Sequence, residues 1–363
     1  MNFDLSEEQV MLGGSVAAYL EKHWDQDRLS IGGIAARRAL WQGMAADLGL
    51  LSVMVPESLG GMGGGMIDAM VVAQELGRHL ALDSFVPTAV YAGTLFQAAD
   101  ATQALEGVGT GKMIVALAHA EHGQLSGARK VATSVENGRL TGTKIMVAGA
   151  PLATHFIVSA QEDEQQTFSL FLLSADATAI TRSDFTMIDG QPASELRFEG
   201  VAVGAETRLG AIGAGADLHL HAADMATIAH TAEAVGMMET LIRTTAAYIT
   251  GRQQFGQPLS AFQALQHRMA DMVLYLEDTR SLLYMALLTD PTDTRAFERA
   301  VTGMKVKAAE ALRFVSQQAV QLHGGMGITS ELMVGHFFKR AMTVNESYGG
   351  PGFYRKRYEA SLD

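Results

Sequence analysis

The sequence has no cysteine among its 363 residues, and this absence excludes several kinds of functional site. Disulfide bonds, thiolate metal sites and cysteine nucleophiles all require the thiol group. We therefore expect no metal centre of this kind and no thiol chemistry. A chain without thiols also fits a reducing compartment, so we expect a cytoplasmic protein.

Long apolar runs and basic runs are missing as well. No stretch approaches the ~18 to 20 apolar residues of a membrane-spanning helix. The start, Met1–Gln9 (M-N-F-D-L-S-E-E-Q), is acidic where a signal peptide would be basic. With 27 Lys and Arg against 39 Asp and Glu, the chain carries a formal net charge of −12, which would repel a phosphate backbone. We expect neither a membrane nor nucleic acid as a partner.

What is present indicates a folded protein of several domains. The composition is 48% hydrophobic and 18% charged, as in globular proteins. A chain of 363 residues exceeds one small domain and predicts two or three.

Residues 1–112 are predicted to form an N-terminal helical domain. Ser6 followed by Gln9 has the spacing of a capping box at a helix start. Two further stretches repeat the helical period: Leu40–Leu48 and Ile67–Leu80. Between them lies the glycine-rich segment Pro56–Gly65, which is either a phosphate-binding loop or a tight reversal. Because a phosphate-binding loop follows a strand and this context is helical, the pattern favours a reversal.

Residues 113–210 are predicted to form a middle antiparallel β-barrel. Six short β-type runs are separated by Gly, Asn and Asp: Met113–Ala118, Lys130–Val135, Leu140–Val147, Thr154–Ser159, Thr167–Leu173 and Ser194–Val203. Regular short strands with turn signals are typical of small barrels or sandwiches. They do not alternate with helices, which excludes a dinucleotide-binding sheet.

Residues 211–363 return to the helical period and predict a C-terminal four-helix bundle. Three long helices are marked by apolar positions between Met225 and Thr245, between Phe262 and Leu283, and between Phe297 and Leu322. Pro291 interrupts the chain between the second and third helices, and Gly324–Gly325 ends the third. The fold class is therefore α+β, with helical, β-barrel and helical domains in that order.

The segment Arg252–Gly256 (R-Q-Q-F-G) follows the first of these long helices. Its arginine offers a planar fork of donors that suits phosphate, and a chain reversal at Gly256 places it at a corner. The alternative is an ordinary polar helix end, at which the helix dipole favours an arginine.

A second segment, Gln321–Gly327 (Q-L-H-G-G-M-G), follows the third helix. Three glycines in four residues allow the backbone to approach a flat or charged ligand, and Gln321 supplies a donor and an acceptor. The alternative is a Schellman-type helix stop without a ligand.

Together these segments resemble the C-terminal signature of the acyl-CoA dehydrogenase family. The order is R-x-x-F-G at Arg252–Gly256, F-Q at Phe262–Gln263, Q-L-H-G-G-x-G at Gln321–Gly327 and Lys339–Arg340 on a following helix. The similarity extends over essentially the whole chain, including A-L-A-H-A-E-H-G at Ala116–Gly123. Within the family, the chain is similar to the small subunits of pimeloyl-CoA dehydrogenase.

The resemblance implies a tetramer that binds FAD at a subunit interface and dehydrogenates an acyl-CoA thioester between Cα and Cβ. Electrons would pass to an electron-transfer flavoprotein. By motif, Arg252 and Phe255 would contact the FAD pyrophosphate and adenine, with Gln263 close by. Gln321 and Gly325 would hold the pyrophosphate from the neighbouring chain.

The family's catalytic base is missing from its usual positions. The two known locations of its glutamate match Gly349 and Ala226, and neither side chain can take a proton. A positioned base contributes ~10² to 10⁴-fold in rate. Glu346 would substitute only if its helix end were rearranged; otherwise it is a solvated carboxylate. Asp224 and Glu233 are weaker candidates for the catalytic base, and a structural role is favoured for both.

The residues expected around the flavin ring also differ from the family pattern. The threonine, tryptophan and threonine of the barrel motif are replaced by Ala120, Met146 and Ala148, whereas Ser126 keeps the family's serine. The adenine and pyrophosphate half of the site is thus retained and the ring half is not. Four hypotheses follow: a subunit that completes a partner's FAD site, a homotetramer with an unusual base, a flavin-free structural or acyl-CoA-binding subunit, or a flavin monooxygenase on this fold.

Overall fold

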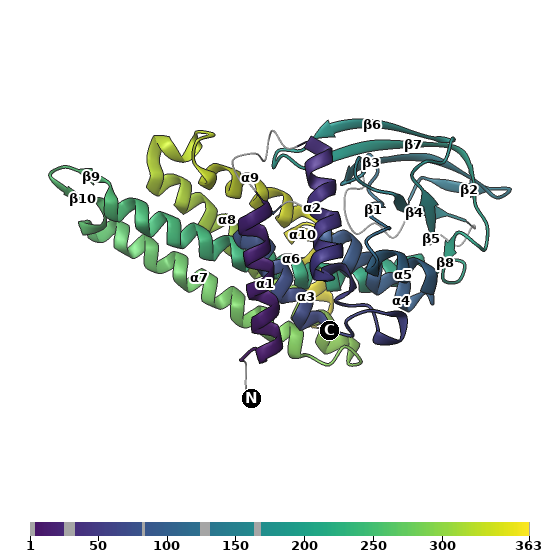
Figure 1. Ribbon diagram of the computed structural model, residues 1–363, viewed down its shortest axis with the longest axis horizontal. Helices are drawn as coiled ribbons and strands as arrows, with labels where there is room; N and C mark the ends of the chain where they lie inside the picture. Colours follow the sequence, from purple (N-terminus) through teal and green to yellow (C-terminus); the bar gives the residue numbers. More distant parts are fainter. Residues whose placement is uncertain (1–3, 25–32, 82–83, 124–130, 163–167, 363) are drawn as a thin grey trace. The chain divides into compact units, whose positions relative to one another are not determined.

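The computed structural model describes residues 4–24, 33–81, 84–123, 131–162 and 168–362 (Figure 1). The chain forms two compact units, each assembled from separate segments. Unit 1 comprises Met1–Gln26, Met70–Ala81 and Thr227–Asp363, and unit 2 comprises Asp27–Ala69 and Leu82–Ala226. The element order is helices, then strands, then helices, as expected. The predicted boundaries at 112 and 210 stay a prediction.

The regular structure of the N-terminal region is helical in its described part. Its helices are α1 (Glu7–His23), α2 (Gly33–Leu48), α3 (Met66–Arg78), the π-helix η4 (Val86–Ala92), α4 (Gly93–Ala98) and α5 (Thr102–Gly109). The capping box at α1 is confirmed: Ser6 Oγ accepts from the Gln9 backbone N–H, and the Ser6 N–H donates to Gln9 Oε1.

The glycine-rich segment before α3 is a tight reversal. After the 3₁₀ turn η3 (Glu57–Leu59), the chain passes so close to Val55 that a Cβ on Gly61 would collide with the Val55 carbonyl. The Gly65 N–H donates to Asp68 Oδ2 over 2.8 Å, so a carboxylate of the chain itself occupies this donor. The prediction of a reversal is confirmed.

The middle region is a mixed sheet in unit 2. Its strands are β1 (Val115–Ala118), β2 (Ser134–Glu136), β3 (Arg139–Ala148), β4 (His155–Gln161), β5 (Phe168–Ser174), β6 (Ile180–Thr186), β7 (Pro192–Ala202) and β8 (Arg208–Leu209). Their order is β6-β7-β3-β2-β4-β5-β8, with β1 beside β4. Most neighbours are antiparallel as predicted, but β4 pairs in parallel with β1 and β2.

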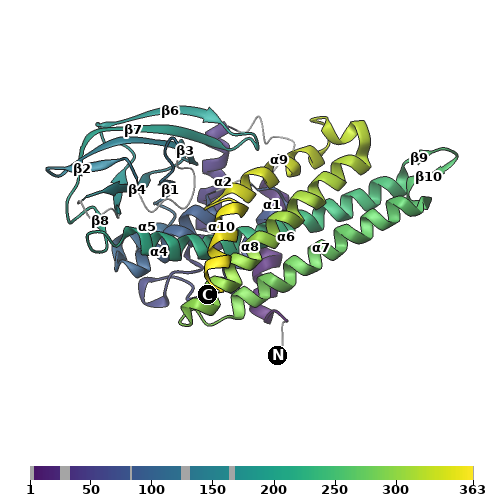
Figure 2. The ribbon, with the colours of Figure 1, turned by 180° about the vertical axis from the view of Figure 1, so that it is seen from behind.

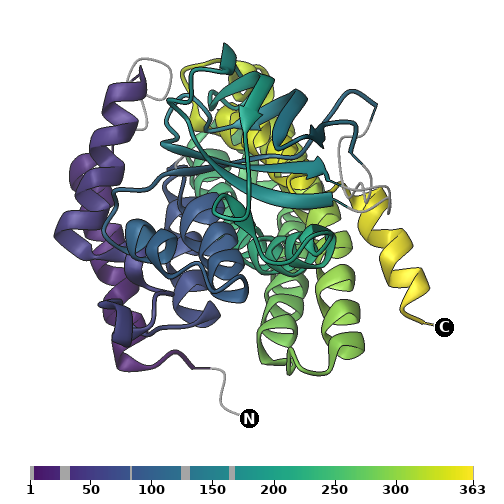
Figure 3. The ribbon, with the colours of Figure 1, turned by 90° about the vertical axis from the view of Figure 1, so that its right-hand side faces the viewer.

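The C-terminal region is dominated by long helices. They are α6 (Gly215–Gly251), α7 (Gln263–Leu288), α8 (Thr294–His323), α9 (Met333–Glu346) and α10 (Pro351–Ala360). In unit 1, α7 and α8 lie side by side in antiparallel directions, most clearly in Figure 3, and Figure 2 shows α9 and α10 against α8. Within the described residues, no helix is both long and apolar enough to cross a bilayer.

Two glycines bring α3 and α6 into backbone contact in unit 1. A Cβ on Gly77 would collide with the Glu233 carbonyl, and a Cβ on Gly236 would collide with the Gln74 carbonyl. Beside this crossing, Arg78 Nε donates to Glu239 Oε2 over 2.6 Å, which fixes the register of the two helices. The crossing therefore holds the start of the unit 1 part of α6 in a defined place.

Candidate functional site

The segment Arg252–Gly256 forms an exposed hairpin at the end of α6. Strands β9 (Gln253–Gln254) and β10 (Gln257–Pro258) pair in antiparallel, and α7 begins shortly afterwards. At the tip, Phe255 and Gly256 have φ angles of 57° and 79°, so both residues are left-handed, as a type I′ turn requires. The predicted chain reversal at Gly256 is confirmed, and the Phe255 side chain is 88% exposed.

The segment Gln321–Gly327 ends α8 in a different way from a Schellman motif. Gly324 has φ 61° and ψ −140°, whereas the left-handed cap of a Schellman motif needs ψ near about +47°. A short 3₁₀ turn, η6 (Gly324–Ile328), follows directly. Gln321 and Gly325 are exposed, and a Cβ on Gly325 would meet no atom within 4 Å, so the backbone is open to approach from that side.

An aromatic stack brings these two segments together at one end of the helical bundle. The rings of Tyr248 on α6 and His323 on α8 are stacked with centroids 4.3 Å apart, and Tyr248 Oη donates to the His323 carbonyl over 3.3 Å. The Arg252 N–H donates to the Tyr248 carbonyl over 2.9 Å, so Arg252 lies one turn beyond the stack. Figure 1 shows the hairpin and the end of α8 at the same end of the bundle.

The first turns of α7 belong to the same end. Arg268 Nη1 on α7 donates to Gln318 Oε1 on α8 over 3.1 Å, which ties the start of α7 to the end of α8. Gln263, the first residue of α7, is exposed there. The structure thus gathers five of the predicted cofactor residues at one end: Arg252, Phe255, Gln263, Gln321 and Gly325. Ser126, the sixth, lies outside the described residues.

The donors at this end suit a diphosphate. Within the described part of the chain, no carboxylate pairs with the exposed Arg252, so its guanidinium is available to an anion. An open glycine backbone and an exposed amide stand beside it, and the exposed Phe255 ring offers an apolar face. Such a set fits an FAD diphosphate with a neighbouring adenine.

At Gly349, one of the two usual positions of the family's base, the backbone leaves no place for a carboxylate. Gly349 has φ 121°, a conformation that residues with a side chain rarely adopt. A Cβ there would lie 2.6 Å from the Phe353 ring and 3.1 Å from the Tyr354 ring. Ala226, the other position, is fully buried on α6.

Glu346 is the last residue of α9, and its side chain is exposed. Its carboxylate folds back against Gly350, where an added Cβ would collide with Oε2. This is the solvated helix-end arrangement that the sequence left open as the alternative. A catalytic role for Glu346 stays a prediction.

A buried polar cluster in unit 1, not predicted from the sequence, joins α6 to α9. Arg340 Nε donates to Glu233 Oε1 over 2.6 Å, and Arg340 Nη2 donates to Oε2 over 3.1 Å. His230 Nδ1 lies 2.8 Å from Glu233 Oε2. Because an ionised carboxylate only accepts, Nδ1 carries the proton and Nε2 keeps its lone pair. The signal in the sequence was H-x-x-E, which places both side chains on one helix face.

The charges in this cluster are set by their surroundings. Burial raises the pKa of Glu233, but Arg340 and His230 outweigh burial and lower that pKa to about 2. Burial lowers the pKa of His230, even though the bond to Glu233 raises it, so the imidazole is neutral at pH 7. Its ring centroid lies 5.7 Å from that of Tyr348, the residue before Gly349.

Lys305 on α8 stands at the end of α9 as a buried cap. Its Nζ donates to the Val344 carbonyl over 2.9 Å, which satisfies one of the last carbonyls of that helix. Burial lowers the pKa of Lys305 to about 8, against the attraction of Glu346 and Glu233. The lysine positions the chain that leads to Tyr348 and Gly349.

In unit 2, the three positions expected to face the flavin ring carry no polar side chain. Met146 lies in a β-bulge of β3, with φ 54° and a side chain 48% exposed. Beside it, the Ile145 N–H donates to the Ala120 carbonyl over 2.9 Å. With Ala148 at the end of the same strand, this bulge has no side chain that could hydrogen-bond to a flavin ring.

A neighbouring buried ion pair fixes the end of β1. Lys144 Nζ donates to Glu121 Oε1 over 2.7 Å, and Glu121 also accepts from the Thr133 N–H over 2.9 Å. Burial lowers the pKa of Lys144 to about 8, against the attraction of Glu121. The backbone around the flavin-ring positions is therefore well held although their side chains are not those of the family.

Comparison with known proteins identifies the family. The model of the acyl-CoA dehydrogenase N-terminal domain matches residues 6–105, and that of the C-terminal domain matches residues 213–353. The acyl-CoA dehydrogenase IpdE2 of Mycolicibacterium smegmatis is 30% identical over 367 residues, which cover 99% of this chain and 100% of the relative.

Two solved structures share the fold over the full length. The ChsE4-ChsE5 complex from Mycobacterium tuberculosis is 27% identical, with a TM-score of 0.89 over 100% of this chain and 99% of that one. The FAD complex of PigA is 25% identical, with a TM-score of 0.89 over the same shares. The chain therefore belongs to the acyl-CoA dehydrogenase family.

Proposed function

We propose that this chain is one subunit of a heteromeric, FAD-dependent acyl-CoA dehydrogenase, and that it holds the diphosphate of FAD while a partner chain supplies the base. The observation that carries the proposal is Gly349, whose backbone and neighbours leave no room for a side chain at the usual position of the base. The intact phosphate-binding end of the bundle argues that a flavin is nevertheless bound.

Each residue at the bundle end has a separate task. The Arg252 guanidinium would neutralise the diphosphate with paired N–H donors, and the open backbone at Gly325 would let it approach. Gln321 would donate from its exposed amide, and Phe255 would cover the adenine face. When bound, FAD supplies the hydride acceptor for the oxidation of an acyl-CoA between Cα and Cβ.

The relatives support a shared site. The ChsE4-ChsE5 complex joins two different chains, and this chain matches one of them over 99% of its length. We propose a heterotetramer in the cytoplasm, with an acyl-CoA as the substrate and an electron-transfer flavoprotein as the electron acceptor. In that assembly the flavin-ring contacts that Ala120, Met146 and Ala148 do not provide would come from the partner.

Flavin stoichiometry tests the proposal. The isolated chain should bind little FAD, and the chain co-expressed with its partner should carry about one FAD per pair. Arg252→Ala should weaken FAD binding by the complex about 10- to 100-fold, because a charge-assisted hydrogen bond contributes roughly 1.5 to 3 kcal/mol. Arg313→Ala, at an exposed arginine of α8, is the matched control and should leave FAD binding unchanged. If the isolated chain carried one FAD per chain and had dehydrogenase activity, the proposal of a site shared between two chains would be overturned.

A second candidate function, a chain active by itself, is favoured by the cluster of His230, Glu233 and Arg340. A neutral imidazole held by a carboxylate has the arrangement of a general base. His230 lies four residues after Ala226 on α6, and its ring lies beside that of Tyr348, the residue before Gly349. In that case the isolated chain would bind FAD and have dehydrogenase activity. His230→Gln would abolish this activity while leaving the amount of bound FAD unchanged.

A further inference from the structure

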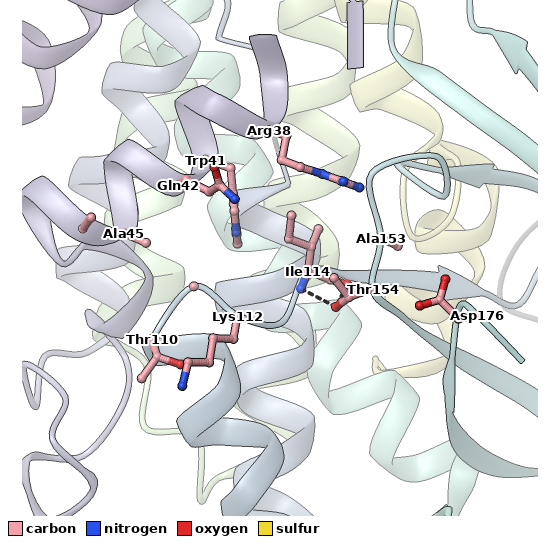
Figure 4. A pocket seen from close by; sticks show the side chains of 12 residues that line it. Arg38, Trp41, Gln42, Ala45, Thr110, Lys112, Ile114, Ala153, Thr154 and Asp176 are labelled. Carbon is pink, nitrogen blue, oxygen red and sulfur yellow. Dashed lines mark hydrogen bonds between the residues drawn. The ribbon is translucent and has the colours of Figure 1, made fainter. Parts of the chain in front are cut away.

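A pocket of about 530 Å³ lies within unit 2, and none of the residues assigned above lines it. Figure 4 shows Arg38 and Trp41 extending from α2, with Ile114 and Thr154 across the space from them. Its volume falls within the range of small-molecule sites, roughly 300 to 1,000 Å³. The pocket therefore has room for a ligand much larger than water.

Two cationic side chains at the rim of this pocket are available to an anion. Among the described residues, no carboxylate pairs with Arg38 or Lys112, both exposed at the rim. Arg38 Nη2 reaches only the Leu152 carbonyl, at 3.5 Å. Exposed cations without a carboxylate partner can form charge-assisted hydrogen bonds with an anion that enters the pocket.

The hydroxyl groups at the pocket are already engaged. Thr154 Oγ1 accepts from the Ile114 N–H over 3.0 Å and donates to the Ile114 carbonyl over 3.2 Å. Thr110 Oγ1 donates to the Glu106 carbonyl over 3.0 Å. With these hydroxyl groups engaged, the cations Arg38 and Lys112 are the strongest donors left to a ligand, and they favour one with acceptor atoms.

The charged side chains around the pocket indicate the net charge of the ligand. Arg38 and Lys112 contribute two positive charges, and Asp176 on the far side contributes one negative charge. A dianion such as a phosphate ester would be repelled by Asp176, whereas a monoanion matches the remaining single positive charge. The buried wall consists of Trp41, Ile114 and Ala153, which suits a compact apolar body.

We infer that this pocket binds a small carboxylate with a compact apolar body, its carboxylate facing the donors of Arg38 and Lys112 and its apolar body lying near the Trp41 ring. The site goes beyond the proposed function because it shares no residue with the flavin-binding end. A ligand bound in the pocket would contact α2 and the chain segments before β1 and β4, which form the walls of the pocket.

Tryptophan fluorescence offers a direct test in the full chain. The chain has two tryptophans, and Trp24 lies in unit 1, so Trp24→Phe leaves Trp41 as the only emitter. Titration with cyclohexanecarboxylate should change the Trp41 emission saturably. The neutral cyclohexanecarboxamide should bind at least about tenfold more weakly, because it loses the charge-assisted bonds.

Two arginine variants decide whether the signal comes from this pocket. Arg38→Ala should raise the dissociation constant about tenfold or more. Arg139→Ala is the matched control, since Arg139 is also an exposed arginine of unit 2 that donates to one backbone carbonyl, that of Gly200, over 3.2 Å. The proposal is overturned by a non-saturable response, by equal binding of the amide, or by equal weakening in the two variants. Far-UV circular dichroism confirms that both variants are folded.

Discussion

Glu233 is a carboxylate held in its charged form inside unit 1, and the pH dependence of folding should report on it. Its pKa lies at about 2 in the folded chain against an ordinary 4.5, because Arg340 and His230 outweigh burial. A depressed pKa stabilises the fold above the unfolded value, and this stability is lost as pH falls from about 4.5 towards 2. Glu233→Gln should therefore cost roughly 3 to 5 kcal/mol at pH 7, since it also leaves Arg340 buried without a counter-charge.

Urea unfolding at pH 7 and at pH 3 measures this effect. The difference between wild type and Glu233→Gln should be largest at pH 7 and smaller at pH 3. Glu277→Gln is a suitable control, because Glu277 also pairs with an arginine, Arg280, but its side chain is 52% exposed. Exposed pairs contribute about 0 to 1 kcal/mol. A pH-independent difference for Glu233→Gln would show that its charge does not stabilise the fold.

At the scale of residues, motif spacing proposes exposed site residues, whose roles stay predictions, but it does not reveal buried contacts. Arg252 and Gln321 follow from motif spacing, because a ligand-binding helix end needs particular residue types at particular positions. The pairing of Glu233 with Arg340 joins positions on two different helices. No local period reveals such a contact, so Glu233 was predicted as a weak candidate for the base with a structural role favoured, and His230 was missed.

At the scale of elements, Gly349 sets the turn between α9 and α10. Gly349→Ala should destabilise the chain by about 1 to 3 kcal/mol, because the residue has φ 121° and an added Cβ would lie 2.6 Å from the Phe353 ring. Gly352→Ala, three residues on in α10, is the control. A Cβ there meets nothing within 4 Å, so helix propensity predicts a gain of roughly 0.5 to 1 kcal/mol.

Chemical denaturation compares these two variants directly. Opposite signs of the stability change are expected, and equal effects would contradict the strained turn. Gly349→Glu should likewise destabilise the turn and should fail to create an active base. The missing carboxylate is therefore a property of the whole turn and not of one side chain.

The strands show where sequence patterns stop being informative. All six predicted β-type runs overlap a strand, namely β1, β2, β3, β4, β5 and β7, and β2 is reached only by the last two residues of its run. Strand β6 was missed, because six of its seven residues are exposed and no apolar pattern marks it. The parallel pairing of β4 with β1 was also missed, because strand direction depends on which strands meet and not on their composition.

At the scale of the whole molecule, the two compact units do not follow the three sequence regions. Unit 1 takes α1 and part of α3 from the N-terminal region, and α6 contributes residues to both units. In unit 2, His219 at the start of α6 stacks on His119, with ring centroids 4.4 Å apart, and bonds to Tyr91 Oη over 2.8 Å. A boundary at 210 would separate this helix start from the unit that it packs into.

Two interleaved units should open independently, and hydrogen exchange of the intact chain can separate them. His219→Ala removes the stack on His119 and the bond to Tyr91, so amides of β1 and β4 should exchange about 5- to 30-fold faster while those of α9 stay protected. Glu233→Gln should do the reverse, since its contacts lie in unit 1. If either variant accelerated exchange equally in both units, the chain would unfold as one cooperative body and not as two separate units.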